Sequence, residues 1–430
     1  MLQGLPRAKL AECVDLLAGY AFKSERFTGA PDDIALVKGE NVSQGAILWD
    51  IAKRWPAAEW ETLSKFQLRT GDVVVAMDRP WVPAGLKWAH IRIDAPKALL
   101  VQRCSRLRSN TPKLDQNFLR FVIGGPEFEG YIRPITTGVN IPHISGKQIL
   151  DFAFRLPPVP AQRRIASILS AYDDLIENCQ RRIRLLEDMA RGLYREWFVH
   201  FRFPGADTLP RVDSPLGSIP QGWAAKRLIE VAAVNRGQIS SRNSPPEIDY
   251  IDIASVSPGH IDSVTRYTFE LAPGRARRVV QHGDVLWSCV RPNRRSHAIA
   301  MHPSEVTIAS TGFAVLSAQA VSFAYLYFAT TTDDFVAYLT NRATGAAYPA
   351  VTAKTFEQAP ILVAPKPLAD AFAEFAEPVL EQVSALSLKI TNLRRTRDLL
   401  LPRLLSGHIT LASAEPDLAS SSAAAMPSLV

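Results

Sequence analysis

The chain has 430 residues, of which 47% are hydrophobic and 21% are charged, so it can build two or three domains with well-packed cores. Its 49 Lys and Arg residues exceed its 42 Asp and Glu residues, and the net charge of +7 favours a polyanionic partner without requiring one, since a basic soluble protein is the alternative. The four cysteines lie far apart, and the sequence has neither a signal-peptide core nor a run of about 18 apolar residues, which leaves a cytoplasmic protein without a membrane span or a disulfide scaffold as the expectation.

Residues 1–160 alternate strand-like segments such as DVVVAM with helical segments such as NFLRFVI, which predicts a mixed α/β (α+β) domain. Near the end of this domain, TTGVNIPHISGKQI looks at first like a phosphate-binding loop, because it contains Gly146 and Lys147. A P-loop, however, needs a glycine five residues before that pair and Ser or Thr after it, and these positions hold Ile141 and Gln148. We interpret the segment as a turn rather than a nucleotide site.

Residues 161–203 are predicted to form a long helix, because apolar side chains recur at alternating spacings of four and three, a heptad pattern of period 3.5. Arg and Glu occupy the other faces and form either a partner surface or a solvated face. The apolar seam consists of Ile165, Leu169, Tyr172, Ile176, Ile183, Leu186, Leu193 and Trp197, with Cys179 and Ala190 in the remaining places.

The second half of the chain repeats the first. Residues 204–225 are rich in Pro, Gly and Ser and are expected to be a linker, and residues 226–367 to form the second domain. In the turn ATGAAYPAVTAKTF, Gly345 corresponds to Gly138, an offset of 207 residues, while VQHGDVLWSCVRP matches LRTGDVVVAMDRP at an offset of 212. Two copies of one module therefore account for almost the whole chain.

Residues 368–406 repeat the heptad pattern as a second long helix. Its seam consists of Phe372, Val379, Val383, Leu386, Ile390, Leu393, Leu400 and Leu404, with Ala376 in register and Arg397 as the one polar break. Pro378 indicates a kink or a late helix start, and Pro402 indicates an end near Leu401 unless the helix bends there. The tail, residues 407–430, is of low complexity and is expected to be disordered.

The two seams are expected to pair as an antiparallel coiled coil, which relates the two domains by a pseudo-twofold axis. A seam of about 33 residues gives a rod of about 50 Å at 1.5 Å per residue, which exceeds the 34 Å turn of B-DNA and implies an unread spacer between two recognised half-sites. The alternative is that each helix packs on its own domain.

The sequence offers no catalytic centre. The nearest approach to an N/D-P-P-aromatic methyltransferase motif is NSPPE at residues 243–247, which has an inserted serine and lacks the aromatic residue. No acid stands two residues before a lysine, as in the commonest metal-dependent nucleases, and no H-E-x-x-H or G-x-S-x-G motif occurs. His297 and His302 are the closest histidine pair and lack an obvious third ligand. We therefore expect a recognition protein with no catalytic residue, metal site or cofactor of its own.

Basic and polar residues gather in corresponding loops of the two copies. Arg and Asn bridge base edges and Arg and Lys bind phosphates, although charged loops also vary without a function. The candidate DNA contacts are Arg79, Trp81, Lys87, Lys38, Asn41, Thr137, Gly138 and Lys147 in the first copy, and Arg291, Asn293, Arg294, Arg295, Ser255, Thr344, Gly345 and Lys354 in the second.

The chain resembles the DNA specificity subunits of type I restriction-modification systems over almost its whole length. The resemblance is carried by LPPVPAQRRIASILSAYDDLIENCQRRIRLLEDMARGLYREWF, by IPQGW before the second domain, and by the closing LRRTRDLLLPRLLSGHI. The proline followed by Q-RRIA is fairly specific, and the second copy departs from it with APKPLADAFAEF, which leaves the start of the second helix open.

The resemblance implies two target-recognition domains that each read one half of a bipartite site in double-stranded DNA. It implies that the chain is not catalytic alone and joins two methyltransferase subunits, which carry S-adenosylmethionine and methylate adenine, and restriction subunits that use ATP and Mg²⁺. Two other classes of function stay open on the residues alone. These are a non-catalytic two-lobed scaffold for protein or RNA partners, and a self-sufficient methyltransferase.

Overall fold

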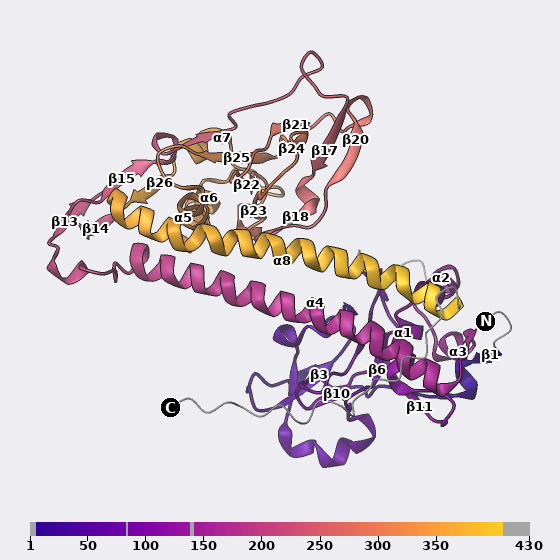
Figure 1. Ribbon diagram of the computed structural model, residues 1–430. Helices are drawn as coiled ribbons and strands as arrows, with labels where there is room; N and C mark the ends of the chain where they lie inside the picture. Colours follow the sequence, from indigo (N-terminus) through magenta and orange to yellow (C-terminus); the bar gives the residue numbers. More distant parts are fainter. Residues whose placement is uncertain (1–5, 83–84, 138–141, 407–430) are drawn as a thin grey trace, which may run out of the picture. The chain divides into compact units, whose positions relative to one another are not determined.

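The computed structural model describes residues 6–82, 85–137 and 142–406 (Figure 1), and they fall into two compact units. The first unit contains the residues up to 176 and those from 391 onward, and the second contains residues 177–390. Each unit holds one globular domain and a stretch of both long helices, α4 (Val159–Tyr194) and α8 (Lys366–Ser406). The predicted disordered tail lies outside the described residues.

The first domain is built on a five-stranded sheet with a second, three-stranded sheet beside it. In the five-stranded sheet the central strand β6, Val73–Ala76, is buried at every residue, because one face packs on helices and the other on the second sheet. The five-stranded order is β2 (Val14–Ala18), β11 (Cys104–Ser109), β6, β9 (Trp88–His90) and β4 (Gln44–Gly45), and the three-stranded order is β10 (Ala98–Leu100), β3 (Ile34–Val37) and β5 (Arg54–Trp55).

Three short helices, α1 (Gln116–Ile123), α2 (Pro126–Ile135) and α3 (Gly146–Leu150), follow the last strand of the sheet. The side chain of Ser145 accepts a hydrogen bond from the backbone N–H of Gln148, and the Gln148 side chain caps Ser145 in return. This capping box starts α3, so the Gly-Lys pair that looked like a phosphate loop forms the first turn of a helix.

The second domain has the same topology as the first, which confirms the tandem duplication. Its central sheet has the order β16-β25-β22-β23, equivalent to β2-β11-β6-β9, and its parallel pair β17-β24 is equivalent to β3-β10. The equivalent helices follow in the same sequence. The bounds are β16 (Ala232–Val234), β17 (Glu247–Ile251), β22 (Val285–Ser288), β23 (His297–Ile299), β24 (Thr307–Ser310), β25 (Phe313–Ala318), α5 (Phe323–Thr330), α6 (Asp333–Arg342) and α7 (Ala353–Glu357).

Each domain is closed by a strand pair at its base. In the first domain, β1 (Arg7–Lys9) pairs antiparallel with β12 (Ala153–Arg155), just before α4 begins. In the second, β15 (Ala224–Arg227) pairs antiparallel with β26 (Pro360–Val363), just before α8 begins. The beginning and the end of each domain therefore lie side by side.

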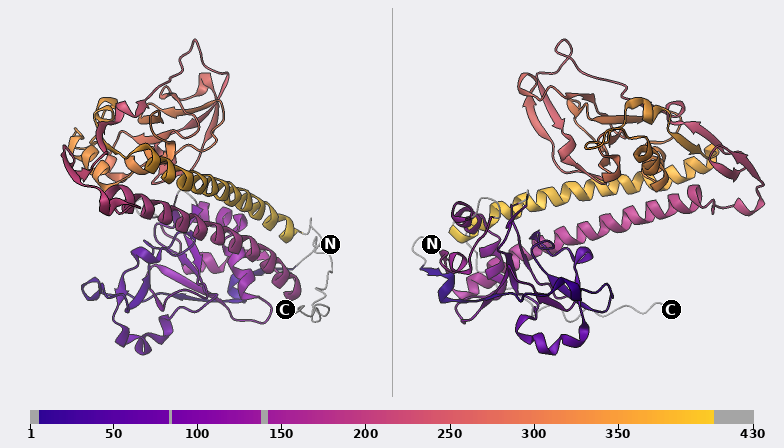
Figure 2. Two further views of the ribbon diagram at one scale, coloured as in Figure 1. Left: turned by 60° about the vertical axis from the view of Figure 1, so that its left-hand side comes forward. Right: turned by 180° about the vertical axis from the view of Figure 1, so that it is seen from behind.

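The two long helices pair antiparallel, as the heptads predict. In the first unit, Ile165 and Leu169 near the start of α4 share a core with Leu404 near the end of α8. In the second unit, Tyr194 at the end of α4 packs edge-on against Phe372 near the start of α8, with ring centroids 5.5 Å apart. Figures 1 and 2 show the two helices side by side in each unit.

Two expectations for the helices need correction. Both Pro378 and Pro402 lie inside α8, which neither starts late nor ends near Leu401. Pro378 is exposed, so water can satisfy the carbonyl that it leaves unpaired, while its neighbours Val379 and Leu380 stay packed in the core. At the end of α4, a π-helical turn at Arg195–Val199 shifts the register, and Phe198 is buried more deeply than the predicted Trp197.

The predicted linker has structure of its own. Strands β13 (Arg211–Ser214) and β14 (Gly217–Pro220) form an antiparallel hairpin, and Ile219 in it is buried. Trp223, which follows the hairpin, packs against the tilted ring of Phe203 at a centroid distance of 5.5 Å. Aromatic burial therefore fixes a segment whose Pro and Gly content predicted only a connection.

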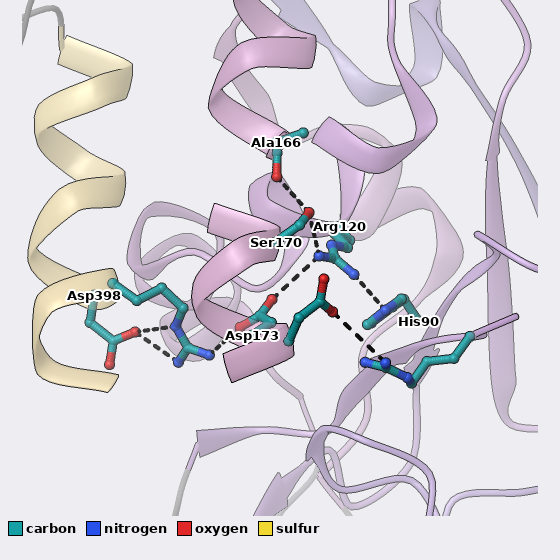
Figure 3. A network of polar contacts seen from close by, with 9 residues as sticks. His90, Arg120, Ala166, Ser170, Asp173 and Asp398 are labelled. Carbon is teal, nitrogen blue, oxygen red and sulfur yellow. Dashed lines mark hydrogen bonds and ion pairs between the residues drawn. The ribbon is translucent and has the colours of Figure 1, made fainter. Parts of the chain in front are cut away.

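A polar network ties the first domain to both helices within the first unit (Figure 3). Asp173 of α4 accepts a hydrogen bond from Nη1 of Arg397 at 2.7 Å, and its other oxygen lies 3.4 Å from Nη2 of the buried Arg120 in α1. Arg120 also donates to the hydroxyl of Ser170 at 2.7 Å and contacts the Nε2 atom of His90. The polar break in the second heptad seam is therefore one end of an ion-pair network.

We expect stability to fall on acidification because the second domain buries a neutral histidine. Burial, with smaller contributions from Arg191 and Arg295, lowers the pKa of His297 to about 3. An unfolded histidine has a pKa of about 6.5, so below that pH the unfolded state binds a proton that the folded state does not. Between these values each pH unit removes about 1.4 kcal/mol of stability.

Urea unfolding of the full chain between pH 7.5 and 4.5 measures this loss. His297→Gln removes the titrating group, so its stability is expected to decline less steeply by about 1.4 kcal/mol per pH unit below about pH 6.5, whatever its starting value. The exposed His200 serves as the control, since His200→Gln should keep the original slope. Equal slopes for the His297 variant and the unchanged chain would contradict the assignment.

Candidate nucleic-acid interface

The second domain presents an arginine-rich loop directly after the buried strand β22. Arg291 has a φ of 51°, a left-handed conformation that is uncommon outside glycine, and its backbone N–H donates to the carbonyl of Pro349 at 2.7 Å. Val290 forms a β-bridge with Ala350, and the N–H of Val351 donates to the carbonyl of Cys289 at 2.9 Å. The loop is thus held against the turn that follows α6, and the turn fixes its backbone.

The side chains of this loop reach the surface beside an exposed aromatic ring. The guanidinium of Arg291 lies 4.5 Å from the centre of the Tyr348 ring, which is 69% exposed, and donates to the carbonyl of Ala347 at 3.2 Å. Asn293 and Arg294 are exposed next to it. A cation stacked on a ring offers both charge and a flat apolar face, a combination that suits a nucleobase or a phosphate.

A cleft of about 310 Å³ opens between this loop, the turn and the loop after β17. Ser255 lies in that last loop but does not itself line the cleft. The cleft is lined by Ile253, Ala254, Val256, Ser288, Val290, Arg291, Arg294, Ser296 and Tyr348.

The first domain repeats the same backbone arrangement. Arg79, equivalent to Arg291, has a φ of 45° and donates its backbone N–H to the carbonyl of Pro142 at 2.8 Å. His143 bridges Asp78 and Thr137, as Ala350 bridges Val290 and Thr344 in the second domain. The arginine loops, 212 residues apart, and the turns that hold them, 207 residues apart, therefore adopt the same conformation in both domains.

The side chains on this shared backbone differ between the domains. In the first domain the carboxylate of Asp78 contacts Nδ1 of His143 and Nη1 of Arg103, the latter at 2.9 Å. Trp81 packs under Arg133, whose guanidinium carbon lies 4.2 Å from the ring centre. The first loop therefore presents the carboxylate of Asp78 among basic and aromatic side chains, whereas the second loop presents mainly arginines.

Several candidates remain exposed where a ligand can reach them. Arg79, Thr137 and Lys147 are exposed in the first domain, and Thr344, Gly345 and Lys354 in the second. Gly345 has a φ of 103°, which only glycine adopts readily. Gly138 lies outside the described residues.

Other candidates are engaged within the protein. Asn41 is wrong as a DNA contact, because its side chain is fully buried and donates to the carbonyl of Leu36 at 3.1 Å. Lys87 donates to the carbonyl of Gly39 at 2.7 Å, and Lys38 forms an ion pair with Glu40 at 3.0 Å.

Arg295 and Ser255 are also engaged. Arg295 forms an ion pair with Asp333 in the first turn of α6, and Ser255 accepts a hydrogen bond from Ser263 at 3.1 Å. Arg294 is exposed, Arg291 is half-buried beside Tyr348, and Arg295 keeps 42% of its side chain exposed within its ion pair.

The sequence did not single out Tyr348, His143, Arg103 or Arg133. Tyr348 stands in the aligned turn directly before Pro349, so an exposed aromatic residue at that position was the available signal. His143 stands in the aligned turn of the first copy, whereas Arg103 in the turn before β11 and Arg133 in α2 reach the loop only through the fold. The expectation for histidine pairs also changes, since His297 is buried against Trp287, whereas His302 lies beside His282 and Glu381.

Among the residues that the structure describes, no helix is long and apolar enough to cross a membrane. The profile of the type I restriction modification DNA specificity domain matches residues 32–188. The MjaIX specificity subunit of Methanocaldococcus jannaschii is 21% identical over 297 residues, which cover 68% of each chain. The EcoAI specificity subunit of Escherichia coli is 30% identical over 179 residues, 42% of this chain and 29% of that one.

The chain is therefore similar to the specificity subunits of type I restriction-modification systems. The crystal structure of the S subunit from M. genitalium is similar in fold, with a TM-score of 0.57 and 14% identity over 93% of this chain and 96% of that chain. The profile match covers the first domain from residue 32 onward and most of α4, and it does not reach the second domain.

Proposed function

We propose that this chain is a specificity subunit that reads a bipartite site in double-stranded DNA, with each domain recognising one half. The observation that carries the proposal is the shared loop: one backbone, built around Arg79 and Arg291, presents different side chains in the two domains. Two domains that recognise different base sequences require different side chains on a common backbone, because side chains contact the base edges.

In the second domain we assign base reading to Arg291 and Arg294 at the edge of the cleft. Arginine binds guanine O6 and N7 with two parallel hydrogen bonds in the major groove, and Tyr348 supports the plane of the guanidinium. The exposed Lys147 and Lys354 stand in the first turns of α3 and α7, which suits phosphate contacts that set the register without reading sequence.

We further propose that the chain is a recognition subunit without chemistry of its own. It would direct adenine methylation by two methyltransferase subunits carrying S-adenosylmethionine, and restriction by subunits that use ATP and Mg²⁺. The charged outer faces of the long helices, which carry Arg181 and Arg184, offer a surface for these partners.

Exchanging residues 7–158, from the start of β1 to the residue before α4, for the corresponding domain of another specificity subunit tests the proposal. The strand pair β1-β12 closes this domain on itself, so the exchange leaves the second domain untouched. Methylome sequencing of a host carrying the methyltransferase and each specificity subunit is expected to show a change in one half of the site only.

The matched control exchanges residues 224–365, from the start of β15 to the residue before α8, and is expected to change the other half. A change in both halves after a single exchange would contradict separate reading by the two domains. If the assembled complex bound duplexes without regard to sequence, the role would pass to a protein or RNA scaffold.

A further inference from the structure

Two histidines of the second domain and one glutamate of α8 meet on the surface. His282 lies in the turn between β21 (Ala276–Val279) and β22, His302 lies after β23, and Glu381 lies on α8. One possible ligand atom from each residue lies within 4.8 Å of the other two. All three belong to the second unit, so the fold of that unit alone brings them together.

The distances within the cluster describe a compact set of donors. Nε2 of His302 is 2.6 Å from Oε2 of Glu381, and Nε2 of His282 is 3.8 Å from Oε1 of the same carboxylate. The two imidazole rings are 4.6 Å apart between centroids. One carboxylate therefore faces two imidazoles.

The backbone positions both histidines. Gly283 has a φ of 79°, and a side chain there would meet Cβ of Phe323 at 2.8 Å, so the turn after His282 requires glycine. The ring of Phe323 packs on the His282 ring at 5.2 Å, and the N–H of Gly283 donates to the carbonyl of Ala300. His302 has a φ of 50°, an uncommon conformation for a residue with a side chain, and such positions cluster at functional sites.

We propose that His282, His302 and Glu381 form a zinc site. Two imidazole nitrogens and one carboxylate oxygen are a donor set that Zn²⁺ takes, with water in the fourth position. Zn²⁺ would take the lone pair of His302 Nε2; a neutral His302 would then carry its proton on Nδ1, and a protonated one would release one proton to the solvent. Glu377, one turn earlier on α8, interacts electrostatically with His282 and adds a second carboxylate near the site.

A zinc ion at this position joins two loops of the second domain to α8. The ligands come from segments about 20 and 80 residues apart, so the metal would restrain the domain on its helix much as a covalent cross-link does. The inference stands on the geometry of the second unit and is independent of the proposed DNA reading.

Calorimetric titration of the untagged full chain with Zn²⁺, after removal of metals by a chelator, tests the site. One ion is expected to bind per chain. His302→Gln and Glu381→Gln are each expected to weaken binding at least about tenfold, because even residues that only support metal ligands contribute that much. His200→Gln, which changes an exposed histidine outside the cluster, is expected to leave the affinity unchanged.

Hydrogen–deuterium exchange gives a second readout. Zinc is expected to slow exchange in residues 281–284 and 300–304 of the unchanged chain and not of the Glu381→Gln variant. Stoichiometric zinc binding that survives both substitutions, or the absence of zinc binding by the unchanged chain, would overturn the proposal.

Discussion

Replacing Asp173 with asparagine is expected to destabilise the first unit by about 3 kcal/mol. The neutral amide leaves the buried guanidinium of Arg120 and the half-buried one of Arg397 without their shared counter-charge. Removing one partner of a buried ion pair costs about 3–5 kcal/mol, and the lower end applies because Asp173 retains 20% exposure of its side chain. Urea unfolding, followed by hydrogen exchange in α1, measures the loss.

The adjacent Asp174 is the matched control. It lies on the same turn of α4 with 67% of its side chain exposed and approaches Arg92 only to 3.8 Å, so Asp174→Asn is expected to change stability by less than about 1 kcal/mol. Replacing Arg120, Asp173 and Arg397 together with leucine or methionine is expected to restore much of the lost stability, because no buried charge then remains. Equal losses for Asp173→Asn and Asp174→Asn would contradict this account.

Arg291→Ala is expected to reduce the discrimination of the complex between its own site and a site altered in one half by about 1–3 kcal/mol, or roughly fivefold to 150-fold. The reason is the loss of a guanidinium that the backbone turn and the Tyr348 ring hold in one orientation. Competition gel shifts of the complex with its methyltransferase subunits, on the site identified by methylome sequencing, measure the effect.

Two further variants separate base reading from charge. Arg291→Lys keeps the charge but not the planar fork, and it is expected to lose most of the discrimination as well. Arg227→Ala removes an exposed arginine of β15 that pairs with Glu230, and discrimination should remain unchanged. A uniform loss of affinity for all duplexes with Arg291→Ala would reassign Arg291 to a phosphate.

Periodicity and repetition predicted the large features of the fold. The heptad pattern predicted the long helices, because a 3.5-residue period can be read from the sequence itself. Ile165 and Phe372 of the two predicted seams are indeed fully buried. The matching turns predicted the duplication in the same way, and the two domains share one topology. The domain limits chosen from composition stay predictions.

The features that the sequence did not predict depend on distant neighbours. In the sequence, Arg397 is a polar residue at an apolar heptad position. The structure explains it, because Asp173, 224 residues away, accepts a hydrogen bond from it. Asn41 reads as a polar loop residue until its burial is known, and Pro378 reads as a helix breaker until the packing of its neighbours is known. The sequence shows the type of each of these residues, whereas the role of each depends on the residues that contact it in the folded chain.

The strand pairs β1-β12 and β15-β26 have a consequence for how the gene can be rearranged. Since each globular part starts and finishes at the same spot, next to a long helix, its coding segment can be excised, replaced or moved without stretching the polypeptide. A circularly permuted chain that begins at the second globular part and ends after the first long helix would preserve both pairings. The chain would be cut in the hairpin segment between the halves, and its original ends would be joined.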